Sequence, residues 1–423
     1  MDHLIMKTNI RYLTLYISAF MILAVSCNKV YDVPVPSVTN SILKGTKPLA
    51  AASKALTEGI YQVNTANSVF GDTLVVKWTR KSLSFACNNG IYFVLDAGSL
   101  NSDILLEGYW RDGYSDGTGL CTMTIAGAEG GNEIVNEIIP QQIIMRGAFG
   151  NGDGTPDQTF TLTYIRPFSD KVKNTKFNVL AHRGGGRTSD RLPVSENSIE
   201  MIDWTERLGS TGIEVDVRLT RDKVAFLYHD ADINIRLAKK GPLSGDIEAY
   251  SWQELSKYVR LIHGEKIPTL EDALTFVINS TNLDFVYLDM KEDKEAMAVV
   301  IPIQQKMLKR ALDKGRVMTI VVGIPSTAVL DDLKTYPDYQ SIPSLCELTV
   351  EDVRTANSIV WAPRWTLGTQ NDLVRQMHSE GKTAMCWTID NPAWIRDYVN
   401  NGHFDGLLTN FPSVVTYYHY IQK

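Results

Sequence analysis

The sequence predicts an α/β fold of the TIM-barrel class for its C-terminal part, preceded by a mostly antiparallel β-sandwich or β-barrel domain. From Phe177 onward, short apolar runs alternate with helical stretches, as in β/α units. Eight such runs fall within about 245 residues, which is the size of one barrel. Before Phe177, strand-like runs are separated by Asn-Gly and Asp-Gly turns, which indicate antiparallel pairing.

Residues 1–26 have the pattern of a secretory signal peptide. Lys7 and Arg11 precede an apolar run that is too short and too lightly flanked for a spanning helix. The segment 23–27, Leu-Ala-Val-Ser-Cys, resembles a bacterial lipoprotein cleavage site, so Cys27 is expected to be lipidated and to anchor the chain to a membrane. We therefore expect an exported, lipid-anchored protein of the bacterial cell envelope. The alternative is an ordinary signal peptide with an incidental cysteine.

The next segment, 27–45, contains Val-Pro-Val-Pro-Ser and is predicted to be a tether. No later run is long and apolar enough to predict a membrane span. A formal net charge of −6 without a basic run argues against nucleic acid as a partner.

Residues 46–170 are predicted to form the β-rich domain, whose role the sequence does not reveal. A helix is expected over 48–63, and Asn88-Asn89-Gly90 predicts a hairpin turn. Trp78 and Trp110 could form a glycan-binding platform, although aromatic residues in such domains usually belong to the core. Cys87 and Cys121 could form a disulfide in an oxidising compartment or remain buried thiols. Four strands are expected here: 73–78, 83–87, 91–95 and 159–164.

Residues 171–423 are predicted to form the barrel. An extra strand or hairpin is expected over 224–229, and catalytic side chains should lie at the carboxyl ends of the strands. The eight expected strands are 178–182, 213–218, 285–291, 317–322, 341–346, 358–363, 383–389 and 405–409.

Polar residues that suit phosphate-ester chemistry fall late in these strands. Glu214 and Asp216 stand two residues apart in an apolar run, so a strand points both carboxylates to one face, where a cation can relieve their repulsion. Oxygen ligands favour a hard ion, Ca²⁺ or Mg²⁺. Asp289 and Lys291 repeat the spacing with one carboxylate and one cation.

Several motifs together resemble the glycerophosphodiester phosphodiesterase family over about residues 175–421. Weaker similarities include the segments 267–274, 381–388 and 405–412. The motifs that carry the resemblance are His182-Arg183-Gly184, Glu196-Asn197, Glu214-x-Asp216-x-Arg218-Leu219-Thr220-x-Asp222 and His229-Asp230.

The resemblance implies a role for each matching position. His182 and His229 would be the general acid and base, in an order that the sequence leaves open. Arg183 and Lys291 would hold the substrate phosphate, and Trp387 would line the substrate pocket. The metal ligands would be Glu214, Asp216 and Asp289.

Two positions depart from the family pattern. The family usually has Glu where this chain has Asp289, and the shorter side chain reduces the reach to an ion. Asn410 replaces the family's usual Asp, which is expected to alter a supporting hydrogen bond. Glu196 is expected to orient His182 or Arg183, whereas Ser195 could be the N-cap of the following helix. The other histidines of the mature chain are expected to have structural or solvent-exposed roles.

The sequence thus predicts a metal-dependent enzyme that hydrolyses glycerophosphodiesters, its small-molecule substrates, to glycerol 3-phosphate and an alcohol. One alternative is a lipid phosphodiesterase that acts on intact phospholipids or on glycerol-phosphate polymers. The other is a non-catalytic surface lipoprotein in which the β-rich domain binds the ligand.

Overall fold

A computed structural model of the 423-residue chain describes residues 35–65, 67–80, 82–291 and 295–423. The predicted signal peptide, Cys27 and the start of the tether lie outside the described residues. Residues 34–423 form one compact unit that contains two barrels.

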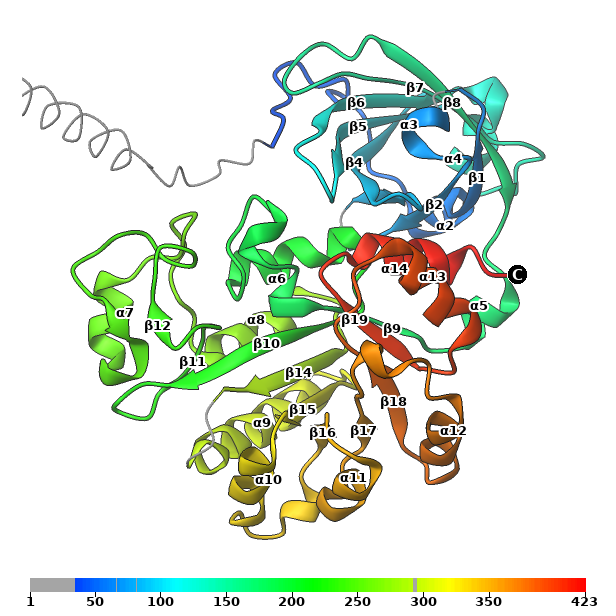
Figure 1. The fold of residues 1–423 in the computed structure, drawn as a ribbon. Helices are drawn as coiled ribbons and strands as arrows, with labels where there is room; N and C mark the ends of the chain where they lie inside the picture. The colour runs from blue at the N-terminus through cyan, green and yellow to red at the C-terminus, as the bar shows by residue number, and fades with distance from the viewer. Residues whose placement is uncertain (1–34, 66, 81, 292–294) are drawn as a thin grey trace, which may run out of the picture. The chain divides into compact units, whose positions relative to one another are not determined.

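The first barrel is closed and antiparallel, and each strand pairs with its neighbour in sequence until the last pairs with the first (Figure 1). The sequence-based alternatives, sandwich or barrel, are thereby resolved in favour of a barrel. Its strands are β1 (Gly59–Val63), β2 (Thr73–Trp78), β3 (Leu83–Ala86), β4 (Ile91–Leu100), β5 (Asp103–Asp112), β6 (Thr118–Ile125), β7 (Ile144–Phe149) and β8 (Gln158–Arg166).

Aromatic rings fill the interior of this barrel. Phe70 contacts Phe93, Phe149 and Phe160 at centroid distances of 4.9, 4.8 and 5.3 Å. Trp110 is buried and donates its indole N–H to the Gly150 carbonyl. Trp78 donates its indole N–H to Thr57. Trp110 therefore belongs to the core, and Trp78 is partly buried against it, as is usual for aromatic residues in such domains.

One expectation for this domain is wrong. The helix expected over 48–63 ends as α2 (Ala51–Thr57), because Gly59 has φ +151° and the residues after it form β1. Of the two alternatives for Cys87 and Cys121, a disulfide or buried thiols, the structure shows buried free thiols. Burial raises the pKa of the Cys87 thiol well above its usual value, so this group behaves as a small apolar side chain.

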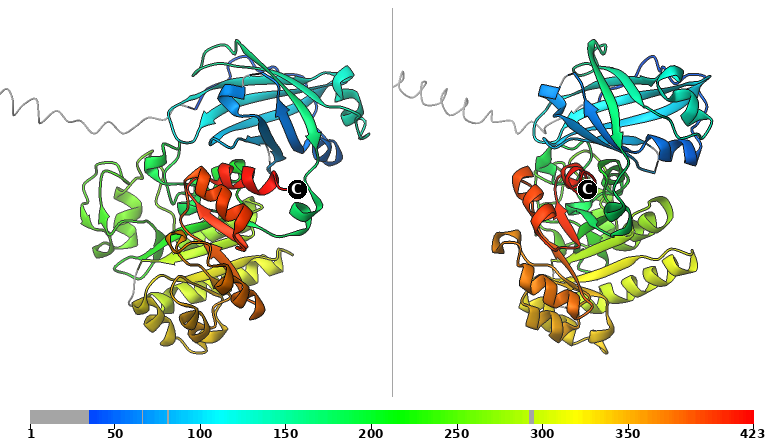
Figure 2. Two further views of the ribbon diagram at one scale, coloured as in Figure 1. Left: turned by 45° about the vertical axis from the view of Figure 1, so that its right-hand side comes forward. Right: turned by 90° about the vertical axis from the view of Figure 1, so that its right-hand side faces the viewer.

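The second barrel consists of eight parallel strands, which confirms the predicted fold class (Figure 2). The extra strand expected over 224–229 is β11 (Ala225–Leu227), which pairs antiparallel with β10. The barrel strands are β9 (Asn178–Ala181), β10 (Gly212–Leu219), β14 (Phe285–Met290), β15 (Thr319–Ile324), β16 (Ser344–Cys346), β17 (Val360–Trp361), β18 (Thr383–Cys386) and β19 (Gly406–Thr409).

Helices surround this second barrel, and a small hairpin, β12 (Asp232–Ile233) with β13 (Gly245–Asp246), lies in the insertion after β11. Two short helices, α3 (Asn67–Phe70) and α4 (Gly131–Val135), pack on the first barrel. The helices that follow β8 are α5 (Asp170–Asn174), α6 (Ile199–Thr205), α7 (Trp252–Tyr258), α8 (Leu270–Ser280), α9 (Ala296–Asp313), α10 (Thr327–Lys334), α11 (Val350–Ala356), α12 (Asn371–Ser379), α13 (Pro392–Asn401) and α14 (Pro412–Tyr420).

Alternation along the strands separates two apolar layers. Ile213, Val215 and Val217 of β10 belong to the layer between strands and helices. A second apolar cluster, which includes Leu180 and Tyr287, is formed mostly by strand residues. Because successive side chains point to opposite faces of a strand, Glu214 and Asp216 point into the barrel. Strand register thus positions the polar site.

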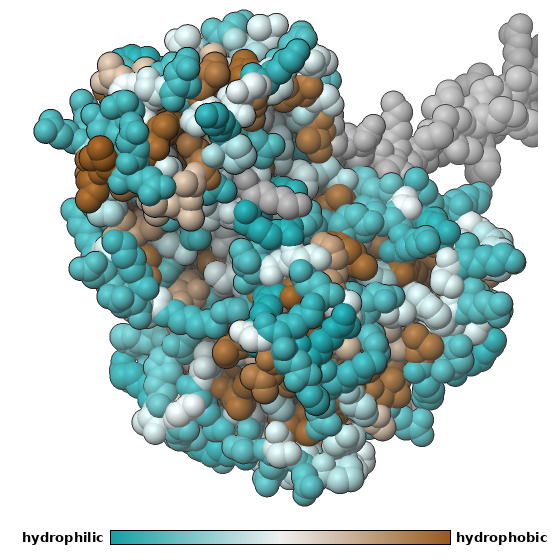
Figure 3. All heavy atoms as spheres, turned by 180° about the vertical axis from the view of Figure 1, so that it is seen from behind, coloured by the Kyte–Doolittle hydropathy of each residue, from teal (hydrophilic) through white to brown (hydrophobic). Residues whose placement is uncertain are grey.

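The surface is mixed in polarity. One face of the molecule carries polar side chains over most of its area, with apolar side chains in small groups (Figure 3). Among the described residues, no helix combines the length and apolar character that crossing a bilayer requires.

Candidate active site

The turn after β9 carries the first predicted pair, His182 and Arg183. Arg183 adopts a left-handed conformation (φ 54°, ψ 36°), and Gly184 follows with φ +83°. At Gly185 a Cβ atom would lie 2.4 Å from Met201 Sδ, so a larger residue would displace the Met201 side chain of α6. The local glycines therefore let the chain reverse tightly beneath α6 while both polar side chains stay at the strand end.

Arg183 is held by carboxylates on two segments. Its backbone N–H donates to Glu214 Oε2 (2.7 Å), and its guanidinium donates to Glu196 Oε1 (2.7 Å). The second oxygen of Glu196 accepts from the Thr188 backbone (2.6 Å). Of the two roles expected for Glu196, the structure places it on Arg183. Ser195 is not the N-cap of α6, because Ser198 accepts from Met201 N, while Ser195 donates to Glu265.

Glu214, Asp216 and Asp289 converge, with one carboxylate oxygen from each lying within 4.8 Å of the others. The register of β10 on β14 places Asp216 directly beside Asp289. Asn197 brackets Asp216, because its side chain donates to Oδ2 (2.6 Å) and accepts from the Asp216 backbone N–H (3.1 Å). Three acidic groups from two neighbouring strands thus share one small volume.

Lys291 lies against two of these carboxylates. Its ammonium is 2.8 Å from Asp216 Oδ1 and also donates to Asp289 Oδ2. Burial favours protonation of Asp216, but Lys291, His229 and Arg183 outweigh it and hold its pKa below the usual value. Burial, with Asp216 and Asp289 beside it, raises the pKa of Glu214 well above its usual value.

These residues suit a hard divalent cation. Glu214 Oε1 is buried and has no hydrogen-bond partner among the residues that the structure describes. One Lys291 ammonium does not balance the negative charge of three carboxylates. A divalent cation bound by the carboxylate oxygens would balance the remaining charge.

His182 is oriented through two hydrogen bonds in series. Its Nδ1 lies 2.8 Å from Asn410 Oδ1, and the Asn410 amide nitrogen donates to Asp390 Oδ2 (2.7 Å). A carboxylate only accepts, so the Asn410 oxygen faces the ring and Nδ1 carries the proton. Burial, with Arg183 nearby, lowers the pKa of His182 to about 3. Its Nε2, 3.8 Å from Glu214 Oε2, is thus the unprotonated nitrogen that faces the site.

His229 has a different partner, a carboxylate. Its Nδ1 lies 2.7 Å from Asp230 Oδ1. Burial opposes ionisation of Asp230, but hydrogen bonds from Arg236, His229 and Asn234 lower its pKa well below the usual value. The two histidines therefore differ in the hydrogen-bond partner of Nδ1, which is a neutral amide at His182 and a carboxylate at His229.

The predicted pocket residue Trp387 donates its indole N–H to the Ala362 carbonyl (2.7 Å), and the Arg364 guanidinium lies 4.8 Å from the centre of its ring.

The sequence reasoning missed Glu347, which follows β16 and accepts from Tyr287 Oη (2.6 Å). Burial, then Asp289, raises the pKa of Glu347 to about 8. No repeated spacing marks this residue, so only the fold brings it to the site.

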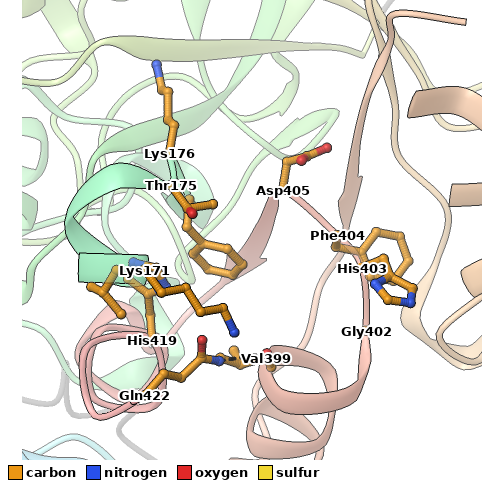
Figure 4. A pocket seen from close by; sticks show the side chains of 12 residues that line it. Lys171, Thr175, Lys176, Val399, Gly402, His403, Phe404, Asp405, His419 and Gln422 are labelled. Carbon is orange, nitrogen blue, oxygen red and sulfur yellow. Dashed lines mark hydrogen bonds between the residues drawn. The ribbon is translucent and has the colours of Figure 1, made fainter. Parts of the chain in front are cut away.

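A separate pocket of about 240 Å³ contains two of the other histidines, His403 and His419 (Figure 4). It is lined by Phe177 and Asp405, which directly precede β9 and β19, and so lies at the amino ends of these strands. His419 is buried and stacks on Phe177 with a centroid distance of 4.7 Å. This packing agrees with the structural role expected for His419.

Relatives of this chain among known proteins are named as glycerophosphodiester phosphodiesterases. A probable glycerophosphodiester phosphodiesterase 2 of Mycobacterium tuberculosis is 45% identical over 96 residues, which are 23% of this chain and only 33% of that protein. A glycerophosphodiester phosphodiesterase of Caldanaerobacter subterraneus subsp. tengcongensis is 22% identical over 248 residues, 56% of this chain and 95% of that protein.

Among solved structures, a glycerophosphodiester phosphodiesterase of Parabacteroides distasonis aligns with a TM-score of 0.45 and 23% identity, covering 57% of this chain and 96% of that one. A phosphodiesterase of Oleispira antarctica, solved with the product sn-glycerol-3-phosphate, aligns with a TM-score of 0.45 and 17% identity over 56% of this chain and 94% of that one.

The sequence model of the glycerophosphoryl diester phosphodiesterase family matches residues 182–414. The match starts at His182, includes every predicted phosphate-binding, catalytic and metal-binding position, and spans more than half of the chain. The chain therefore belongs to the glycerophosphoryl diester phosphodiesterase family.

Proposed function

We propose that this protein hydrolyses glycerophosphodiesters to glycerol 3-phosphate and an alcohol, with a divalent cation. The observation that carries the proposal is the convergence of two buried carboxylates and one partly buried carboxylate with His182, Arg183 and Lys291 at the carboxyl ends of the strands. Family membership and the names of the relatives support the same reaction.

The positive side chains of Arg183 and Lys291 bind the negatively charged phosphate of the substrate. The Arg183 guanidinium is fixed by Glu196 and can turn its remaining N–H groups to phosphoryl oxygens. Glu214, Asp216 and Asp289 would hold a divalent cation, which would supply further positive charge to the phosphate in the transition state. Together these groups offset the negative charge that develops as the phosphorus–oxygen bond breaks.

The hydrogen bonds of the two histidines suggest an order of proton transfer. His182, with its proton on Nδ1, accepts the nucleophile's proton at Nε2. His229, which Asp230 holds through its Nδ1, gives its proton to the oxygen of the departing alcohol. The nucleophile is water, or a hydroxyl of the substrate's glycerol followed by hydrolysis of the cyclic phosphate.

Release of glycerol 3-phosphate from glycerophosphodiesters tests the proposal. We expect activity that a chelator abolishes and that an added divalent cation restores. His182→Ala and His229→Ala should each lower kcat by about 10²- to 10⁴-fold, the usual range for general acid–base groups. His403→Ala, at the opposite end of the barrel, is the matched control and should retain full activity.

Two results would contradict the mechanism: unchanged activity in chelator, or unchanged activity in either histidine variant. Absence of activity on every glycerophosphodiester, together with release of products from intact phospholipids or glycerol-phosphate polymers, would favour the lipid-directed alternative. Absence of activity on all of these substrates would favour the non-catalytic one.

We further propose that the protein is anchored at the bacterial cell envelope through Cys27. The basic start, apolar run and Leu-Ala-Val-Ser-Cys segment support this location. Incorporation of labelled palmitate into the expressed protein, and its loss in Cys27→Ser, is the expected result. A Cys27→Ser variant that is labelled and sediments with membranes as the parent does would exclude this anchor.

A further inference from the structure

The turn between β5 and β6 of the first barrel has a well-defined shape. Asp112 caps it by accepting from the Tyr114 backbone N–H (2.9 Å) and from the Ser115 hydroxyl (2.5 Å). At its base, the Gly113 N–H donates to the Gly90 carbonyl (3.1 Å), which ties the turn to the neighbouring hairpin. The turn can therefore present a side chain in a fixed direction.

Tyr114 of this turn reaches two loops of the second barrel. Its hydroxyl donates to the Asp390 carbonyl (2.7 Å), in the loop after β18. Its ring stacks on Phe411, which follows β19, with a centroid distance of 4.1 Å and an interplanar angle of 27°. Tyr114 of the first barrel thus contacts two loops of the second barrel, each of which follows the carboxyl end of a strand.

A second attachment lies beside the first. Arg111, which is buried at the end of β5, donates to the Arg191 carbonyl, and Asp116 forms an ion pair with the Arg191 guanidinium. Arg191 lies in the loop after β9, which also carries Arg183 and Glu196. The β5–β6 turn therefore holds three loops of the active-site face at once.

The contact at Asp390 leads to a predicted catalytic histidine. The Asp390 carboxylate accepts from the Asn410 backbone (2.8 Å) and from its side chain (2.7 Å). Asn410 in turn accepts from His182 Nδ1 (2.8 Å), and Phe411 is its neighbour in sequence. Tyr114 contacts this chain of hydrogen bonds at two points. Its hydroxyl bonds to the Asp390 carbonyl, and its ring stacks on Phe411, the residue after Asn410.

We propose that Tyr114 is a positioning residue for His182, and that the first barrel braces the active site through it. The proposal rests on the proposed function only in assigning a catalytic role to His182. Tyr114 does not touch the reacting groups; it keeps Asp390 and Asn410 where they hold the His182 ring in one orientation with the proton on Nδ1. Loss of this support would let the ring and its tautomer vary.

Tyr114→Phe tests the brace, because it removes the hydroxyl and keeps the stacked ring. We expect a three- to tenfold lower kcat for glycerol 3-phosphate release, KM within twofold of the parent and an unchanged melting temperature. Tyr114→Ala, which also removes the ring, should lower kcat further. The matched control is Thr73→Val, which removes another hydrogen bond between the barrels, the one between the Thr73 and Tyr417 hydroxyls (2.7 Å), away from His182.

A spectroscopic measurement separates this proposal from the proposed function. In protein labelled with ¹⁵N-histidine, the His182 ring nitrogens should report the Nδ1–H tautomer in the parent and in Thr73→Val, and a mixture of tautomers in Tyr114→Phe. The proposal is overturned if Tyr114→Phe leaves the tautomer unchanged, or if Thr73→Val disturbs it equally. A parent enzyme without activity would refute the proposed function, while the spectra would still decide on the brace.

Discussion

The side-chain length of Asp289 bears directly on the affinity of the site for a metal ion. It lies beside Asp216 and contacts Lys291, but it is one methylene shorter than the glutamate that the family resemblance implies. We expect Asp289→Glu to bind Ca²⁺ or Mg²⁺ about tenfold more tightly, about 1.4 kcal/mol, because its carboxylate reaches farther. Isothermal titration calorimetry measures this difference. Asp289→Asn, which removes the charge at equal length, should bind the ion at least tenfold more weakly; tighter binding by the parent than by Asp289→Glu would contradict the argument.

His419 should make stability depend on pH. Burial, with Lys171 and Lys77 nearby, lowers its pKa to about 4, below the usual value of about 6.5. Between these values the unfolded chain binds a proton that the folded chain does not, so stability falls as the pH is lowered through this range. From pH 7 to pH 5 we expect a loss of about 2 kcal/mol from this group.

Urea unfolding of the parent and of His419→Phe at both pH values checks this prediction. Phenylalanine keeps a ring against Phe177 and cannot titrate. The variant should therefore lose about 2 kcal/mol less than the parent over the same interval. Equal losses in the two proteins would show that His419 does not contribute to the pH dependence.

At the scale of elements, the N-cap of α6 supports the turn that carries His182 and Arg183. Ser198 is fully buried, accepts from Met201 N (2.9 Å) and donates to the Ser195 carbonyl (2.7 Å). Because water cannot replace these partners, Ser198→Ala should cost about 1–2 kcal/mol in the free energy of unfolding. The control is Ser326→Ala at the N-cap of α10, where the cap is partly exposed and the bond is longer (3.3 Å), so about 0.5 kcal/mol is expected. Equal losses from denaturant titrations would contradict the role of burial.

The elements of the second barrel could be predicted because each strand has a local signal. Apolar runs mark all eight strands, although the run over 358–363 pairs only as Val360–Trp361. The interior position of Glu214 and Asp216 also follows from period-two alternation. The helix expected over 48–63 failed because a single glycine, Gly59, and the strand-forming residues after it outweigh the helical pattern before it.

The rest of the site depends on contacts between distant segments. Glu347 reaches Tyr287 across 60 residues, and Tyr114 reaches Asp390 across 276 residues. Neither pair has a spacing that a sequence pattern can detect, because their proximity depends on barrel closure and on the contact between the barrels. The sequence leaves the state of Cys87 and Cys121 open for a related reason, since composition permits a bond and only the structure shows two free thiols.

At the scale of the whole molecule, the two barrels share an apolar cluster. Phe168, which follows β8, is buried in it with Ile60 of the first barrel and Tyr417 of α14. The Phe168 ring also lies 4.7 Å from Tyr420, and Arg166 donates to the Ile421 carbonyl (2.6 Å). The last helix of the second barrel therefore packs against strands of the first.

This shared cluster predicts cooperative unfolding. Calorimetry of the parent should show one transition whose calorimetric and van't Hoff enthalpies agree. Phe168→Ala removes a buried ring from the contact at a cost of about 3 kcal/mol, so the barrels should lose part of their coupling. The variant's transition should then broaden or split, and its calorimetric enthalpy should exceed the van't Hoff value. Two transitions in the parent, or a lower melting temperature in Phe168→Ala with the enthalpies still equal, would show that this cluster does not couple the barrels.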